Sequence, residues 1–386
     1  MKLLVLLFSA SIPLILGKDY ISDIIQNAGY RSSFHRVTTK DGFILGLHRM
    51  NQRARSRTRH ANPILLMHGI VQSAAVWVYD GPGRSLAMLL SDAGYDVWML
   101  SARGTTVSSQ HRNLSPEEEN YWDFSFHDIA TKDLPATVDY ILRKTGHESL
   151  HYVGHSQGGT VFVAFMAFLP EYNAKIRSSY LLAPATFMQN VQGVFTGILD
   201  FLFEHKLEVA EAMRNAKFYA LKLRQPFITE MLPSICVNNF LCNLVRDVIL
   251  GPSSAQLDDR MSTHDMMKYT FDNIAIKQLF HFIQLIYTDK FQLYDMVPNN
   301  RDFYGSDKIP EYNLTNLNIP LTVFYGTKDV LVNATDVEKF LSLPHIKGIL
   351  KGAKKLPWAH MDFVSGRDAP QEIHQYILRQ LRFYRK

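Results

Sequence analysis

The sequence predicts an α/β fold in which a mostly parallel sheet is flanked by helices and interrupted by an all-helical insertion. In the first half of the chain, short apolar strands alternate with amphipathic helices, which is typical of a parallel sheet covered on both faces. Residues 186–306 have helical periodicity instead, and the alternation returns at Leu321. We therefore assign residues 18–185 and 307–386 to the core and 186–306 to a helical cap or lid over the carboxyl edge of the sheet.

Each element follows from local periodicity and turn chemistry. Asp41-Gly42 predicts a hairpin, and Pro135 marks a new first turn within a helical stretch. The hairpin is expected to pair residues 34–37 with residues 43–48. Further strands are expected at 63–67, 95–100, 180–183 and 321–325, and one more from residue 150 into Gly154. Helices are expected at 21–27, 86–93, 126–143 and 160–169 in the core, at 195–203, 207–217 and 274–287 in the cap, and after residue 360.

The N-terminus has the pattern of a secretory signal peptide. Met1-Lys2 is a short charged start, and Leu3 to Leu16 is an apolar run too short and too interrupted to span a bilayer. We expect a signal peptide at 1–17, with Gly17 near the cleavage point. Because no later stretch reaches transmembrane length, we predict a secreted protein without a transmembrane anchor. Delivery to the lysosome is the alternative. We also expect a monomer.

Composition excludes several classes of protein. A hydrophobic content of 47% and an aromatic content of 12% indicate a filled core and exclude disorder. The net charge of +5 is modest, and no nucleic-acid motif accompanies it, so no nucleic-acid partner is expected. The basic run from Arg53 to Arg59 is interpreted as a solvated loop, the alternative being contact with an anionic lipid surface.

The cysteines and sequons fit the secretory route. Two cysteines are too few for a disulfide framework, so Cys236 and Cys242 either pair across a short loop or stay free. Three Asn-X-Ser/Thr sequons are candidate glycosylation sites. They begin at Asn113, Asn313 and Asn333.

The most informative stretch runs from Leu150 to Thr160. A β-type segment ends in Gly154-His155-Ser156-Gln157-Gly158, and a small, apolar helical run follows. This is the context of a nucleophile elbow, a strained strand-to-helix turn that presents a serine hydroxyl free of the backbone. Gly154 and Gly158 are expected because side chains there would collide with the neighbouring strand and helix. The alternative is a glycine-rich turn without chemical consequence.

A serine nucleophile needs a histidine to take its proton and a carboxylate to orient that histidine. In α/β-hydrolases these partners follow in the order Ser, Asp, His. Asp329 comes directly after the predicted strand at 321–325, and His360 precedes the C-terminal helix. Alone, either residue would be a loop acid or a core histidine. Together they predict Ser156 as nucleophile, His360 as general base and Asp329 as the orienting acid, with Asp362 as the rival carboxylate.

Two backbone N–H groups should stabilise the oxyanion that forms when the serine attacks. One is that of Gln157, the residue after the nucleophile. The other is expected in the loop after His68-Gly69, most simply at Ile70. The alternative is that His68-Gly69 is a mere turn.

The chain resembles the animal acid lipases, the gastric and lysosomal group that includes insect digestive members. The matching segments, in order, are 39–45, 68–70, 93–98, 133–137, 151–158, 326–329, 360–363 and 369–372. The resemblance implies an α/β-hydrolase core with a helical cap and lid, and hydrolysis of carboxylic esters of neutral lipids without a metal or other cofactor. It also implies the triad Ser156, Asp329 and His360, with Ile70 and Gln157 lining the oxyanion hole.

Three departures from the family pattern lie in the cap or beside the elbow. A cysteine that forms the cap disulfide in gastric members falls at Leu250, which leaves Cys242 without its usual partner. A Pro-Ala-Gly-Thr/Ser segment reads Thr-Phe-Asp-Asn-Ile-Ala at 270–275, and Gly159 stands where threonine is common. These departures bear on substrate preference and lid behaviour more than on the reaction.

The sequence thus predicts a serine lipase that acts on triacylglycerol, cholesteryl ester or both at a lipid–water interface. The methionine-rich stripes of the cap are interpreted as ordinary core, the alternative being an adaptable apolar surface that faces a substrate. Two other functions stay open, an esterase for small soluble esters and a non-catalytic lipid-binding protein. A long apolar cap favours the lipid substrate, because a buried acyl chain needs a large hydrophobic trough.

Overall fold

The computed structural model describes residues 19–51, 62–192, 196–231, 251, 256 and 266–384. The predicted signal peptide, the arginine run, Cys236, Cys242 and Leu250 lie outside the described residues. None of the described helices is long and apolar enough to cross a membrane.

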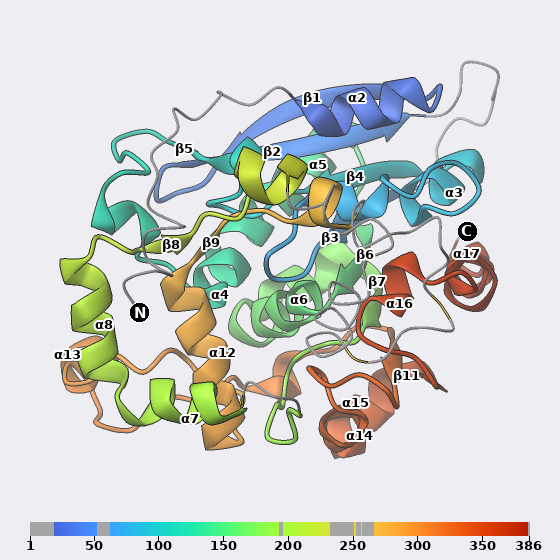
Figure 1. Cartoon of the computed structure of the whole chain (residues 1–386). Helices are drawn as coiled ribbons and strands as arrows, with labels where there is room; N and C mark the ends of the chain where they lie inside the picture. The colour runs from blue at the N-terminus through green and yellow to red at the C-terminus, as the bar shows by residue number, and fades with distance from the viewer. Residues whose placement is uncertain are drawn as a thin grey trace.

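The described residues build a nine-stranded sheet in the order β1-β2-β4-β3-β6-β7-β10-β11, with β5 paired to β2 (Figure 1). Pairs involving β1, β2 and β5 are antiparallel, and the remaining pairs are parallel. This confirms the predicted fold class. The bounds are β1 Arg31–Thr38, β2 Phe43–Asn51, β3 Pro63–Met67, β4 Asp96–Leu100, β5 Gln110–His111, β6 Leu150–His155, β7 Ile176–Leu182, β10 Leu321–Gly326 and β11 Leu350–Leu356.

The burial of each strand explains whether it could be predicted from the sequence. Every residue of β3, β6 and β10 is buried, because parallel strands covered on both faces read as continuous apolar runs. β11 is an edge strand in which exposed residues alternate with half-buried ones, and it carries Lys351, Lys354 and Lys355. Lysines are common on edge strands, since they discourage pairing with another chain. Its polar composition hides β11 from a search for apolar runs.

Helices flank the sheet, and most of the expected core helices are present, although the helices at 334–342 and 344–349 were not expected. The predicted helix at 126–143 is divided into α4, a π-helical turn at Ile129–Asp133, and α5, which has Pro135 in its first turn. The core helices are α2 Tyr20–Asn27, α3 Leu86–Asp92, α4 Phe126–Asp128, α5 Leu134–Thr145, α6 Gln157–Phe168, α14 Ala334–Ser342, α15 Pro344–Ile349, α16 Asp362–Ser365 and α17 Gln375–Arg382.

Between β7 and β10 the regular structure of the described chain is mostly helical. It forms α7 Thr196–Glu204, α8 Lys206–Asn215, α12 Ile276–Thr288 and α13 Asn300–Tyr304, which gather at one end of the molecule (Figure 1). Buried side chains of α12 pack against α7 and α8 in a small apolar cluster of their own. The predicted helix at 274–287 was wrong at its start, because Ile274–Ala275 forms strand β9 and pairs with Ala220–Leu221, β8.

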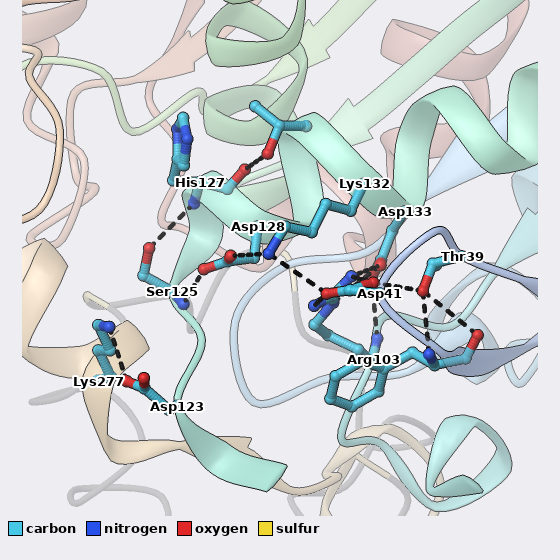
Figure 2. A network of polar contacts seen from close by, with 12 residues as sticks. Thr39, Asp41, Arg103, Asp123, Ser125, His127, Asp128, Lys132, Asp133 and Lys277 are labelled. Atoms are coloured by element: carbon cyan, nitrogen blue, oxygen red, sulfur yellow. Dashed lines mark hydrogen bonds and ion pairs between the residues drawn. The ribbon is translucent and has the colours of Figure 1, made fainter. Parts of the chain in front are cut away.

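A buried ion network joins three parts of the core (Figure 2). The Arg103 guanidinium donates to Asp133 on the π-helical turn before α5, with Nε–Oδ1 at 2.8 Å, and to Asp41 in the β1–β2 turn, with Nη1–Oδ2 at 2.7 Å. Burial by itself lowers the pKa of Arg103, but the two carboxylates raise it above its ordinary value. The network therefore fixes the hairpin turn against α5 and the loop after β4.

Candidate active site

Ser156 occupies a strained turn at the carboxyl end of β6. Its backbone has φ 53° and ψ −119°, a region that non-glycine residues rarely adopt. The Ser156 N–H donates to Leu182 O of the adjacent β7 at 2.8 Å, and α6 begins at the next residue. The predicted strand, turn and helix are all present, so the segment has the geometry of a nucleophile elbow.

Close backbone contacts explain the glycines of the elbow. A Cβ at Gly158 would lie 2.3 Å from Met67 O, and a Cβ at Gly154 would lie 2.5 Å from Gly158 O. At Gly159, where the resembled family commonly has threonine, a Cβ would lie 2.7 Å from Cβ of Pro184. Gly159 thus matches the close approach of Pro184 in this chain.

Asp329 and His360 meet because their loops leave adjacent parallel strands at the same edge of the sheet. Lys328 N donates to Trp358 O at 3.1 Å, which joins the loop after β10 to the loop after β11. A Cβ at Gly326 would lie 2.1 Å from Trp358 O, so this approach requires glycine. His360 Nδ1 lies 2.7 Å from Asp329 Oδ2, and both side chains are buried.

The two candidate carboxylates make different hydrogen bonds. Asp329 directs Oδ2 to His360, while its Oδ1 accepts the N–H groups of Leu331 and Val332 at 3.0 and 2.8 Å. Asp362 instead accepts the Ala359 N–H at 2.8 Å and so braces the turn that carries His360. The geometry favours Asp329 as the acid that orients the imidazole.

His155 links the elbow to the His360 loop. Its Nε2 lies 3.1 Å from His360 O, and the two imidazole rings are 4.9 Å apart. Burial, assisted by the neighbouring His360 ring, lowers the pKa of His155 well below its ordinary value, so this ring is neutral and donates to the carbonyl. Ser156 Oγ and the His360 ring are not hydrogen-bonded to each other. Catalytic hydrogen bonds commonly tighten only when substrate binds.

The loop after β3 lies against the elbow. A Cβ at Gly69 would lie 3.1 Å from Ser156 Cβ, so glycine permits this contact. Gln72 Oε1 accepts the Gly69 N–H at 2.9 Å, and His68 accepts the Ala102 N–H through Nε2 at 3.0 Å. Burial lowers the pKa of His68 to about 4, so it remains a neutral brace.

The two predicted oxyanion donors remain available. No residue in the described part of the chain accepts a hydrogen bond from the Ile70 N–H. Gln157 is the first residue of α6, where a helical N–H has no partner within the helix. Each N–H belongs to a residue beside the point where Gly69 contacts Ser156.

Four supporting residues were not assigned roles from the sequence. Gln72, His155, Asp272 and Gln278 are buried polar side chains, and each has a partner in a distant segment, namely Met361, His360, Thr106 and Gln157 in turn. His155 stood inside the elbow motif, and Asp272 inside the departure at 270–275. No sequence signal distinguished Gln72 or Gln278 from an ordinary polar residue.

The fold and the elbow define an α/β-hydrolase, and comparison with known families agrees. A family model described as "alpha/beta hydrolase fold" matches residues 62–364, and one described as "Partial alpha/beta-hydrolase lipase region" matches residues 21–81. The chain belongs to the α/β-hydrolase family and, within it, to the group of gastric and insect lipases, and it is an ester-hydrolysing enzyme.

Relatives match along nearly the whole chain. Lipase 3 of Drosophila melanogaster is 34% identical over 377 residues, which cover 95% of this chain and 95% of that protein. Gastric triacylglycerol lipase of Homo sapiens is 33% identical over 372 residues, covering 93% and 89%. A solved structure from Sulfolobus solfataricus has a TM-score of 0.62 at 13% identity over 92% of this chain and 95% of that one, a likeness of fold alone.

Proposed function

We propose that the protein is a secreted serine lipase that hydrolyses neutral lipids, triacylglycerol or cholesteryl ester, with Ser156, His360 and Asp329 as its triad. The observation that carries the proposal is the 2.7 Å contact between His360 and Asp329, held beside a strained Ser156 elbow by His155. Strain of this kind persists only where the surrounding structure enforces it, and it clusters at functional sites.

In the proposed mechanism, Ser156 Oγ attacks the ester carbonyl carbon while its proton passes to His360 Nε2. Asp329 accepts the Nδ1–H of the ring, which leaves Nε2 unprotonated in the resting enzyme and stabilises the imidazolium that forms. The Gln157 and Ile70 N–H groups donate to the developing oxyanion.

The two halves of the reaction share these groups. Collapse of the tetrahedral intermediate breaks the ester C–O bond, and His360 gives its proton to the departing alcohol. A water molecule then attacks acyl-Ser156 with His360 again as base, which releases the fatty acid and restores the serine hydroxyl.

The described residues of the insertion predicted at 186–306 support a lipid substrate, and we propose that the insertion acts as the cap. Large apolar side chains of this segment face solvent, and they lie chiefly on α7, on α8 and at 227–231. Ile198 is 56% exposed, Phe201 54% and Met231 51%. Exposed apolar side chains are favourable where lipid replaces water. A relative named gastric triacylglycerol lipase, at 33% identity, is consistent with the same substrate class.

The proposal includes secretion with N-glycosylation, the lysosome being an alternative destination. Asn113 and Asn313 are exposed, as a glycan requires, whereas Asn333 is half-buried. We therefore expect glycans at Asn113 and Asn313 before Asn333. Peptide mapping of secreted protein with and without glycosidase treatment measures the occupancy of each site.

Activity of the purified protein on emulsified triacylglycerol, emulsified cholesteryl ester and a short soluble ester tests the substrate class. We expect turnover of at least one emulsified lipid, and its loss in Ser156→Ala. Turnover of the soluble ester alone would favour an esterase. Lipid binding without turnover of any substrate would favour a non-catalytic lipid-binding protein.

A further inference from the structure

One segment of the cap contacts the loop that carries the first proposed oxyanion donor. Ser73 N donates to Thr270 O at 3.2 Å, and Asp272 N donates to Val71 O at 2.9 Å, around an antiparallel bridge between Gln72 and Phe271. Val71 has φ 57°, a left-handed conformation that is costly for a β-branched residue. The loop is therefore strained directly after Ile70, and the cap segment satisfies its backbone groups.

Asp272 anchors this segment to the core. Its side chain is fully buried, and Oδ1 accepts the Thr106 N–H and hydroxyl and the Asn273 N–H, each at 2.8 Å. Oδ2 is also buried and has no hydrogen-bond partner among the described residues. Burial raises the pKa of Asp272. Thr106 begins the turn at Thr106–Ser108 in the loop after β4, so the anchor point belongs to the core.

The same segment contacts the residue that supplies the second donor. Gln278, in the first turn of α12, is 2% exposed, and its Nε2 donates to Gln157 Oε1 at 3.1 Å. Its Oε1 accepts the Ala275 N–H at 3.1 Å, which fixes the amide orientation. Because Gln157 is 1% exposed, its side chain cannot turn out to solvent to replace this bond.

We infer that residues 270–278 form an oxyanion strap, in which Asp272 and Gln278 are positioning residues for the Ile70 and Gln157 N–H groups. The strap reaches both sides of the proposed oxyanion hole and ties them to one cap segment. This inference rests on the proposed function, in which those two N–H groups stabilise the oxyanion. Neither positioning residue touches the reacting atoms.

The strap makes a kinetic prediction that a merely structural role does not. Oxyanion donors interact with the transition state more strongly than with the substrate, so displacing them lowers kcat and leaves KM nearly unchanged. Loss of a whole donor costs about 10²–10³ in kcat, and a displaced donor should cost less, roughly tenfold. Affinity for a tetrahedral adduct should fall by the same factor.

Gln278→Met tests the strap, because methionine keeps the side-chain length and removes both hydrogen bonds. Gln284→Met is the matched control. Gln284 lies on the same helix and is buried, and it bonds Leu293 O and Asp295 N without contacting the elbow. The readouts are kcat and KM on a short soluble ester and the inhibition constant of a trifluoromethyl ketone that adds to the serine.

We expect Gln278→Met to lower kcat and inhibitor affinity roughly tenfold with KM changed less than about twofold, and Gln284→Met to change each by less than about twofold. Similar behaviour of the two variants, with Ser156→Ala inactive, would overturn the strap and leave the proposed function intact. Full activity of Ser156→Ala would overturn the proposed function itself.

Substitutions of Asp272 provide a second, independent test of the strap. Asp272→Asn keeps the acceptor for Thr106 and Asn273 and should retain kcat within about threefold, whereas Asp272→Ala removes it and should lower kcat roughly tenfold. Equal kcat in the two variants would contradict the positioning role of Asp272. If Asp272→Ala does not fold, the comparison of the Gln278 and Gln284 variants decides the inference.

Discussion

Replacing Asp329 by asparagine should disable the general base while leaving the side-chain shape unchanged. In the parent protein, Asp329 Oδ1 accepts two backbone N–H groups and Oδ2 faces His360 Nδ1. The asparagine oxygen must stay at the two N–H groups, because the amide NH₂ cannot accept from them. The NH₂ group then donates to Nδ1, which moves the ring proton to Nε2, the atom that should receive the proton of Ser156.

The size of the effect follows from this change of tautomer. The same substitution in serine proteases lowers kcat by about 10⁴, so we expect a loss of three to four orders of magnitude here, or about 4–5.5 kcal/mol in activation free energy. The assay is kcat/KM on a short soluble ester, with thermal unfolding to show that the variant is folded.

Asp362→Asn is the matched control. Asp362 braces the Ala359 N–H, so its replacement should lower stability and change kcat/KM by less than about tenfold. A loss below tenfold for Asp329→Asn, or a larger loss for Asp362→Asn, would refute the assignment of the orienting carboxylate.

Three further predictions concern the ion network and the cap. Arg103→Met should lower the free energy of unfolding by about 3–5 kcal/mol in urea titrations, because it leaves the Asp133 carboxylate buried without a counter-charge. Burial alone raises the pKa of Asp41, but the hydrogen bonds from Arg103 lower that pKa well below its ordinary value. The ionised Asp41 carboxylate therefore stabilises the fold above about pH 4, and this stabilisation is lost as the pH falls further. Asp41→Asn should therefore be destabilising at pH 7 and progressively less so below pH 4. Phe201→Asp should lower turnover of emulsified lipid at least fivefold and of a soluble ester less than twofold, since Phe201 is 54% exposed on α7.

Two control variants accompany the cap prediction, one outside the cap and one inside it. Phe383→Asp places the same charge at another exposed phenylalanine, near the end of the chain, and should leave both activities unchanged. Phe203→Asp alters a ring that stacks on Tyr287 inside the cap cluster, and it should destabilise the cap. Equal loss on both substrates in folded Phe201→Asp would contradict a role at the lipid surface.

A control for the Arg103 ion network compares its buried ion pair with an exposed ion pair. Asp307→Asn removes one partner of an ion pair with Arg301 whose side chains are 73% and 75% exposed, and it should change stability by less than about 1 kcal/mol. A pH-independent destabilisation by Asp41→Asn down to pH 2 would contradict the ionic origin of its effect.

Local patterns were sufficient for the strands that matter most to the site. Pro63–Met67 and Leu321–Gly326 are runs of residues buried on both faces, and the turn at their carboxyl ends places the site residues. β7 begins four residues before the expected Tyr180, because Arg177, Ser178 and Ser179 interrupt the apolar pattern. Tertiary pairing with β6 and β10 overrides their weak strand propensity.

The residues of the candidate site likewise fall into those that the sequence predicted and those that it did not. Ser156, Asp329 and His360 were predicted because chain order and strand context constrain them. The residues that position them were not predicted, because their roles exist only through contacts between distant segments. Examples are the contact of Gln278 with Gln157 and that of His155 with the His360 carbonyl. Polar residues of this kind acquire a role only once the fold has placed their partners.

The central claim is that Ser156 is the nucleophile of an ester hydrolase. Treating the purified protein with a fluorophosphonate and mapping the modified peptide by mass spectrometry tests this directly, with Ser156→Ala as the control. We predict a single stoichiometric adduct on Ser156, complete loss of esterase activity on labelling, and neither adduct nor activity in Ser156→Ala. Labelling at another residue with loss of activity, or turnover by Ser156→Ala within tenfold of the parent, would contradict the account.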